Sequence, residues 1–289
     1  MAAAMLLLMT ASLEGQPGAE GKIPAWKTGT DYDSLSHNMG DTLACSERIS
    51  LYREAGDNSD HLTAGGLLRQ LISDCPDESE ELYIDAEEMY RELYERTGEL
   101  VYVDSMIMII TQRIYYFDNR LPLDLHKADI LFDLAGDDPE YLSLCYNVLA
   151  EVAESSPDQM DCRYFVRLAT AAASLYAMGI IDSGELGYAF VTAMGTLDWR
   201  MESNPAGCKH AGDLENLETF YRTSGAMTCE GLGTLYAGKI DRNFRDTAFV
   251  GKVFAMLNEA GCGQSDLYYN VAVKMFANDR SAANAVRAA

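Results

Sequence analysis

The chain has 289 residues, 48% of them hydrophobic, so it is long enough to bury a substantial core and is not expected to be disordered. Lys and Arg number 22 against 45 Asp and Glu, a net charge of -23 that repels nucleic-acid phosphates over most of the surface. We therefore expect no nucleic-acid partner. Only 7 prolines, with 14 Met and 17 Tyr, favour packed helices over a sheet-rich fold.

The first 40 residues are predicted to lie outside the folded domain. Residues 1–13 (MAAAMLLLMTASL) are apolar but too short to span a bilayer, and a polar, Gly-rich stretch follows them. This is typical of a signal-peptide core, although no basic residues precede it, so we expect export to the periplasm or a similar compartment. Residues 14–40 lack apolar periodicity and are predicted to be a flexible linker. The predicted domains are the leader, 1–40, and a helical-repeat domain, 41–289.

Apolar residues at helical spacing, interrupted by Gly and Pro, predict about a dozen helices after the linker. Only the run 105–116 (SMIMIITQRIYY) could also be read as a strand, and its flanks favour a buried helix. The expected helices cover residues 43–55, 60–74, 79–97, 99–117, 121–134, 139–154, 158–178, 183–201, 210–223, 229–240, 246–260 and 265–277.

Short connections between helices of about 12 to 20 residues are typical of stacked antiparallel hairpins, in which each unit covers the apolar face of its neighbour. The predicted fold class is therefore all-α, an α-solenoid. We expect one face of this solenoid to be concave and to be lined by the first helix of each hairpin.

Three stretches carry a family resemblance. They are CSERISLYRE with LLRQLISDCPDESEELYIDAEEMY, RYFVRLATAAASLYAMGIIDSGEL, and SGAMTCEGL with VFAMLNEAGCGQSDLYYNVAVKMF. Together they resemble tetratricopeptide (TPR)-like helical-repeat proteins of bacterial cell envelopes, from about Cys45 to Ala289. The resemblance implies a TPR-like right-handed superhelix, localisation in the cell envelope or periplasm, and a role in protein or peptide binding. It supplies no catalytic residues. The terminal SAANAVRAA resembles the start of one more repeat, which leaves open whether the chain is part of a longer repeat protein.

The seven cysteines are the most informative chemistry. Cys45 lies at the start of one expected helix, and Cys75 lies at the end of the helix that follows it. Cys229 and Cys262 have the same arrangement in a later pair of helices. In an antiparallel hairpin these ends lie side by side, within the separation that a disulfide requires. We predict the bonds Cys45–Cys75 and Cys229–Cys262, each stabilising the fold by roughly 3 to 4 kcal/mol. The alternative is that all the cysteines are reduced and buried.

The pairing of the other three cysteines is not predicted, except that Cys145 and Cys162 lie early in successive helices and are not expected to be bonded to each other. No pairing is predicted for Cys208 either.

The spacing of the cysteines and of the four histidines does not fit a metal site. Motifs for nucleotide binding and acyl transfer are missing as well. The sequence therefore predicts no catalytic residues, no cofactor, no metal, and no enzymatic activity.

Binding is the expected function. Tyr83, Tyr90 and Tyr94 share one face of an expected helix and are candidates for a binding face, with inter-helix packing as the alternative. The expected partner is another envelope protein or a peptide segment, held by a mature chain without a membrane span. Two alternatives stay open: a glycan-capturing envelope protein, which would need exposed tryptophan, and a helical-toroid hydrolase or lyase, which would need a closed ring around a polar cavity. The oligomeric state is not predicted.

Overall fold

A computed structural model describes residues 44–280 except 205–206 and 210. All regular structure within that part of the chain is helical: twelve α-helices and one short 3-10 turn, η2 (Pro157–Gln159). The predicted leader, residues 1–40, and the terminal SAANAVRAA lie outside the described residues. The helices are α2 (Cys45–Asp57), α3 (His61–Asp74), α4 (Glu80–Thr97), α5 (Leu100–Phe117), α6 (Arg120–Ala135), α7 (Pro139–Ser155), α8 (Cys162–Ala177), α9 (Ser183–Ser203), α10 (Ala211–Ser224), α11 (Cys229–Arg242), α12 (Thr247–Glu259) and α13 (Asp266–Asn278).

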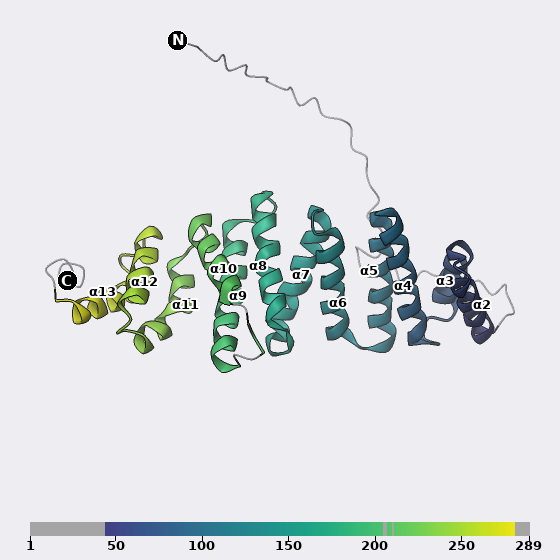
Figure 1. Cartoon of the computed structure of the whole chain (residues 1–289), viewed down its shortest axis with the longest axis horizontal. Coiled ribbons are helices and arrows are strands. Elements are labelled where there is room, and N and C mark those ends of the chain that lie inside the picture. Colours follow the sequence, from purple (N-terminus) through teal and green to yellow (C-terminus); the bar gives the residue numbers. More distant parts are fainter. Residues whose placement is uncertain (1–43, 205–206, 210, 281–289) are drawn as a thin grey trace, which may run out of the picture.

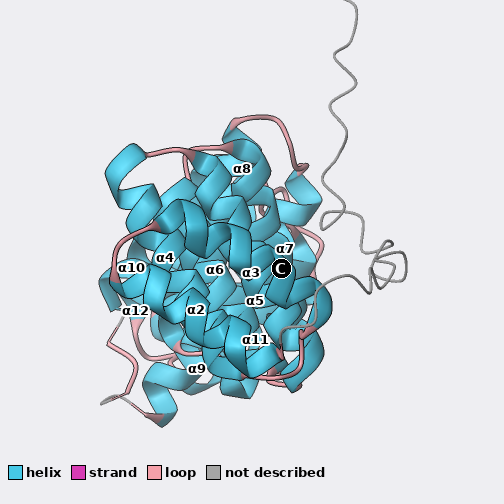
Figure 2. Cartoon of the chain, turned by 90° about the vertical axis from the view of Figure 1, so that its right-hand side faces the viewer, coloured by secondary structure: helices cyan, strands magenta, loops and turns pink. Residues whose placement is uncertain are grey.

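These helices pack mainly against their neighbours in sequence, as antiparallel pairs. Figure 1 shows the pairs side by side in an elongated row, with α2 at one end and α13 at the other. Figure 2 looks along this row from the end that carries α2. The run 105–116 lies inside α5, so its strand alternative is wrong.

The helix boundaries follow local signals. The side chain of Asp60 accepts a hydrogen bond from the backbone N–H of Thr63 (3.1 Å) and begins α3, and Asp182 begins α9 with a capping box that includes Glu185. Gly98 ends α4 with φ at 69°, a left-handed conformation that costs glycine little. These capping residues and Gly98 lie between one apolar helical stretch of the sequence and the next. The connections between helices are therefore short.

One predicted boundary is wrong. The sequence predicts a helix over 158–178, but Pro157–Gln159 form the 3-10 turn η2 and α8 begins only at Cys162. The turn is held from outside, because the guanidinium of Arg200 on α9 donates hydrogen bonds to the carbonyl oxygens of Pro157 (2.5 Å) and Met160. Tertiary contacts thus override the local helix preference here.

The buried side chains form two clusters. The smaller one joins α2, α3 and α4 and includes Tyr52, Leu68 and Tyr83, together with Ile109 of α5. The larger one runs continuously from α5 to α13 and includes Phe165 and Phe190. The first hairpin therefore has a core of its own that touches the rest of the molecule through α4 and α5.

Three disulfides each join the start of one helix to the segment that follows the next helix. The structure contains both bonds that the sequence predicts, Cys45–Cys75 with a Cα–Cα distance of 5.9 Å and Cys229–Cys262 at 5.5 Å. It adds a third, Cys162–Cys208, at 5.8 Å. In each case the first cysteine opens a helix (α2, α8 or α11) and the second follows the end of the next helix (α3, α9 or α12). Disulfides of this kind fix the ends of antiparallel neighbours side by side.

Ion pairs also connect alternate helices. The distances between the charged atoms of these pairs, 2.7–3.4 Å, show that each helix contacts the next but one in the row, as stacked hairpins require. The pairs are Arg53–Glu81 between α2 and α4, Arg167–Asp133 between α8 and α6, Lys239–Asp198 between α11 and α9, Lys252–Glu218 between α12 and α10, and Lys274–Asp241 between α13 and α11.

Candidate functional site

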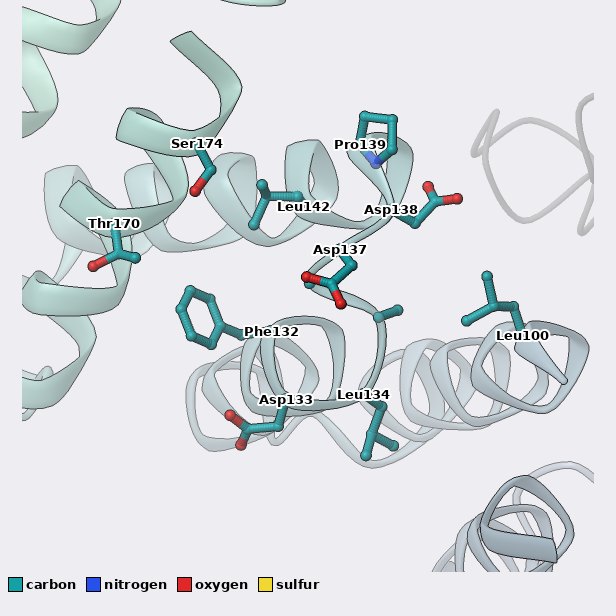
Figure 3. A pocket seen from close by; sticks show the side chains of 12 residues that line it. Leu100, Phe132, Asp133, Leu134, Asp137, Asp138, Pro139, Leu142, Thr170 and Ser174 are labelled. Atoms are coloured by element: carbon teal, nitrogen blue, oxygen red, sulfur yellow. The ribbon is translucent and has the colours of Figure 1, made fainter. Parts of the chain in front are cut away.

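A cavity of about 590 Å³ lies at the turn between α6 and α7. Elements well separated in sequence build it: the start of α5, the end of α6, the start of α7 and the second half of α8. Figure 3 shows Phe132 and Leu142 facing the space between α6 and α7, with Asp137 projecting into the same space from the turn. Leu100 of α5 and Ser174 of α8 close the sides. A volume of this size is within the range of ligand sites in proteins.

Local sequence explains the shape of the turn. Asp138 caps α7, because its Oδ1 accepts hydrogen bonds from the backbone N–H groups of Glu140 (2.8 Å) and Tyr141 (3.4 Å). Pro139 occupies the first helical turn, where its missing N–H costs nothing. Helix α6 ends at Ala135, so the negative end of its dipole lies at this turn beside the acidic side chains.

The three carboxylates of the cavity differ in their surroundings. Asp133 is neutralised by Arg167, whose guanidinium nitrogen lies 2.8 Å and 2.9 Å from the two carboxylate oxygens. Asp138 is engaged as the helix cap. Asp137 is exposed and makes no hydrogen bond or ion pair with any described residue. The cavity thus combines apolar walls with one unengaged negative charge.

A second cavity, of about 390 Å³, lies between α2, α3 and α4. Its lining carries four carboxylates, of which Asp57 and Glu88 have no ionic or hydrogen-bond partner among the described residues. Arg53 is the one arginine in the lining, and it is already paired with Glu81 at 2.8 Å. The ring of His61 is 14% exposed, and neither of its nitrogens has a hydrogen-bond partner. This cavity is also electronegative.

The tyrosines predicted as a binding face pack between helices instead. Tyr83 is only 1% exposed, and its hydroxyl donates a hydrogen bond to the carbonyl oxygen of Pro76 (2.7 Å). Tyr90 and Tyr94 are half-buried against the hydrophobic clusters, and the Tyr94 hydroxyl donates to the carbonyl oxygen of Leu134 (2.6 Å). A buried ring with a bonded hydroxyl stabilises the fold and offers little to a ligand. The packing alternative therefore describes these residues, and we do not propose them as a binding face.

Other potentially reactive side chains include the unpaired cysteine and the histidines. Cys145, the one unpaired cysteine among the described residues, is buried and donates weakly to the carbonyl oxygen of Ala128 (3.5 Å). Burial raises the pKa of its thiol to about 12. Of the histidines, His126 contacts Glu87 (2.7 Å), whereas His37 and His210 lie outside the described residues. No set of three metal-binding side chains comes together within the described part of the chain.

The cavities could not be predicted from the sequence. Leu100, Asp137 and Ser174 come from three different elements, and no spacing in the chain marks them as neighbours. The local sequence carries a narrower signal: an Asp directly before a Pro at a helix start is typical of a cap, and Asp138 caps α7.

Comparison with known proteins gives no identity. No family model matches the chain, and no curated protein shows significant similarity to it. The resemblance to TPR-like envelope proteins therefore stays a prediction. Within residues 44–280, apart from the gaps, none of the helices combines the length and the apolarity that crossing a bilayer requires.

Proposed function

We propose that this protein is a non-catalytic scaffold that binds a segment of another protein or a peptide. The observation that carries the proposal is the open cavity at the α6–α7 turn, where apolar side chains surround an unengaged carboxylate on an elongated row of helices. Peptide grooves commonly combine apolar pockets with a few placed polar groups. The row supplies a long, continuous surface on which an extended segment can lie, as in α-solenoids.

Export is part of the same proposal. Three disulfides are typical of proteins from oxidising compartments, and the periplasm is the compartment that the family resemblance implies. Trapping of thiols in intact cells, followed by mass spectrometry, tests this point. Recovery of the six cysteines in reduced form would argue against an oxidising compartment.

Peptide binding is tested by selecting peptides from a display library on the oxidised protein and mapping bound peptides by hydrogen exchange. We expect slower exchange at residues 132–142 and at the start of α5, and no change at the α7–α8 turn on the opposite edge of the row. If no peptide is selected, or if protection falls away from both cavities, the proposal is wrong.

The glycan alternative has one observation in its favour, since Trp199 on α9 is 57% exposed and Tyr188 lies on the same helix face, also exposed. Exposed aromatic rings stack on sugars as well as on peptides. A glycan array with wild-type protein and Trp199→Ala separates the two functions. Glycan binding that the substitution abolishes would replace the peptide proposal.

The enzyme alternative lacks its structural basis in the described residues. A toroidal hydrolase or lyase needs a ring of helices that closes around a polar cavity. Helices α2 and α13 instead lie at opposite ends of the row (Figure 1). The absence of catalysis remains a prediction.

A further inference from the structure

Both cavities border the turn within a helix pair. One lies at the turn from α6 to α7, and the other borders the turn from α2 to α3, at Gly56, Asp57 and His61. In a row of antiparallel pairs, the turns within successive pairs fall on the same edge. Figure 1 shows the α4–α5 and α6–α7 turns along the upper edge of the row, and Leu100, just after the α4–α5 turn, lines the α6–α7 cavity. We call this edge, from Asp57 to Pro139, the turn edge.

The turn edge is electronegative at both cavities. Asp137 is unengaged in one, and Asp57 and Glu88 are unengaged in the other. No lysine or arginine lines the first cavity, and the arginine that lines the second is already paired. Each cavity also has an apolar component, Phe132 in the first and Met89 in the second, against which the methylene groups of a basic side chain can pack. The guanidinium of Arg167 already lies over the Phe132 ring, 5.0 Å from its centroid, so a ligand meets only the remaining part of that ring.

We propose that the turn edge binds an extended, cationic segment of a partner protein, with one lysine or arginine side chain in each cavity. This inference rests on the proposed function and names the chemistry of the partner. The α2–α3 and α6–α7 turns that the two cavities border are separated by the intervening pair α4–α5. The partner is therefore expected to carry two basic residues separated by several positions of extended chain.

Synthetic peptides test the spacing. Three fluorescent probes share a neutral, extended Ser- and Leu-containing background: one has a lysine near each end, one has two adjacent lysines, and one has a glutamate near each end. We expect the widely spaced lysine probe to bind most tightly in fluorescence anisotropy, because only it can occupy both cavities at once. Equal binding of the lysine and glutamate probes would overturn the proposal.

Substitutions locate the contacts. Asp137→Asn and Glu88→Gln remove one charge from each cavity, and each is expected to weaken the widely spaced probe about three- to five-fold, with the double variant reduced to the affinity of the adjacent-lysine probe. Matched controls are Asp158→Asn and Glu154→Gln, exposed acids without described partners at the opposite end of α7. Unchanged urea midpoints verify folding. Equal weakening by the controls would show general attraction to an acidic chain and would sink the proposal.

Failure of this inference and failure of the proposed function are distinguishable. Display-selected peptides that bind at the α6–α7 turn without basic residues, and with affinity unaffected by Asp137→Asn, would overturn the cationic partner while leaving a peptide-binding scaffold in place. If no peptide of any composition binds, the scaffold function itself fails.

Discussion

At the scale of single residues, the buried charge of Glu87 connects two hairpins. Its Oε1 lies 2.7 Å from His126 Nε2 of α6 and 3.0 Å from a guanidinium nitrogen of Arg91 on its own helix. Burial alone would raise the pKa of this carboxyl, but the hydrogen bonds and positive charges of His126 and Arg91 outweigh burial and lower the pKa below its ordinary 4.5. The contact joins the two helix pairs α4–α5 and α6–α7.

The lowered pKa makes this contact pH-dependent. A carboxyl whose pKa is lower in the folded state contributes stability that is present above its unfolded pKa of about 4.5 and is lost as the pH falls through the folded value. Glu87→Gln is therefore expected to lower the free energy of unfolding by about 1.5 to 3 kcal/mol at neutral pH and by less at about pH 3. Urea unfolding across this range measures the difference. The exposed neighbour Glu88→Gln is the control, and a loss that does not depend on pH would contradict the assignment.

Cys145 is expected to be inert. Because the thiolate is the reactive species, a buried thiol with a pKa of about 12 reacts very slowly near neutral pH. We expect the native protein to incorporate no iodoacetamide at Cys145 and the unfolded, unreduced protein to incorporate one equivalent there, since the other six cysteines are bonded. Intact-mass measurement decides this. Rapid labelling of the native protein would mean that the site opens locally.

At the scale of elements, the disulfides act on different parts of the core. Cys45–Cys75 closes the α2–α3 pair, whose cluster is separate from the main one, whereas Cys162–Cys208 closes α8–α9 inside the main cluster. In the chain-entropy model the sequence separations of 30 and 46 residues correspond to roughly 3.5 and 4 kcal/mol. The two disulfides contribute similar stabilisation energies, so their effects differ mainly through the part of the core that each one joins.

The location leads to a prediction for hydrogen exchange. The double variant Cys45→Ala with Cys75→Ala is expected to accelerate exchange in α2 and α3 and to leave α6 to α9 unchanged, because the first hairpin can open without disturbing the main cluster. The double variant Cys162→Ala with Cys208→Ala is expected to lower the urea midpoint of the whole molecule. Uniform acceleration in the first variant would mean that all pairs unfold as one unit.

The same elements show what the sequence could predict. Apolar periodicity and Gly or Pro breaks located twelve helices, and the hairpin argument located two disulfides. The third was missed because the expected helix over 158–178 placed Cys162 inside a helix, whereas the hydrogen bonds from Arg200 delay the start of α8 to that residue. Periodicity also placed Tyr83 on a helix face without showing which helix covers that face.

At the scale of the whole molecule, charge opposes the fold while packing and disulfides hold it together. Ion pairs between alternate helices neutralise some carboxylates, for example Asp133 through Arg167. With 45 acidic and 22 basic side chains, the chain carries a net charge of -23 that ion pairing leaves in place. Unpaired charges of one sign on an elongated row repel one another, and dissolved ions screen this repulsion.

Salt is therefore expected to stabilise the protein. Raising NaCl from about 0.05 to about 0.5 M shortens the screening length from roughly 13 Å to roughly 4 Å, which weakens the repulsion among unpaired carboxylates more than it weakens the close ion pairs. We expect the urea midpoint to rise at neutral pH. Near the isoelectric point, where the net charge approaches zero, the rise should disappear, and this serves as the control. A midpoint that falls with salt at neutral pH would mean that the ion pairs between alternate helices, and not the excess negative charge, dominate the electrostatic free energy of the row.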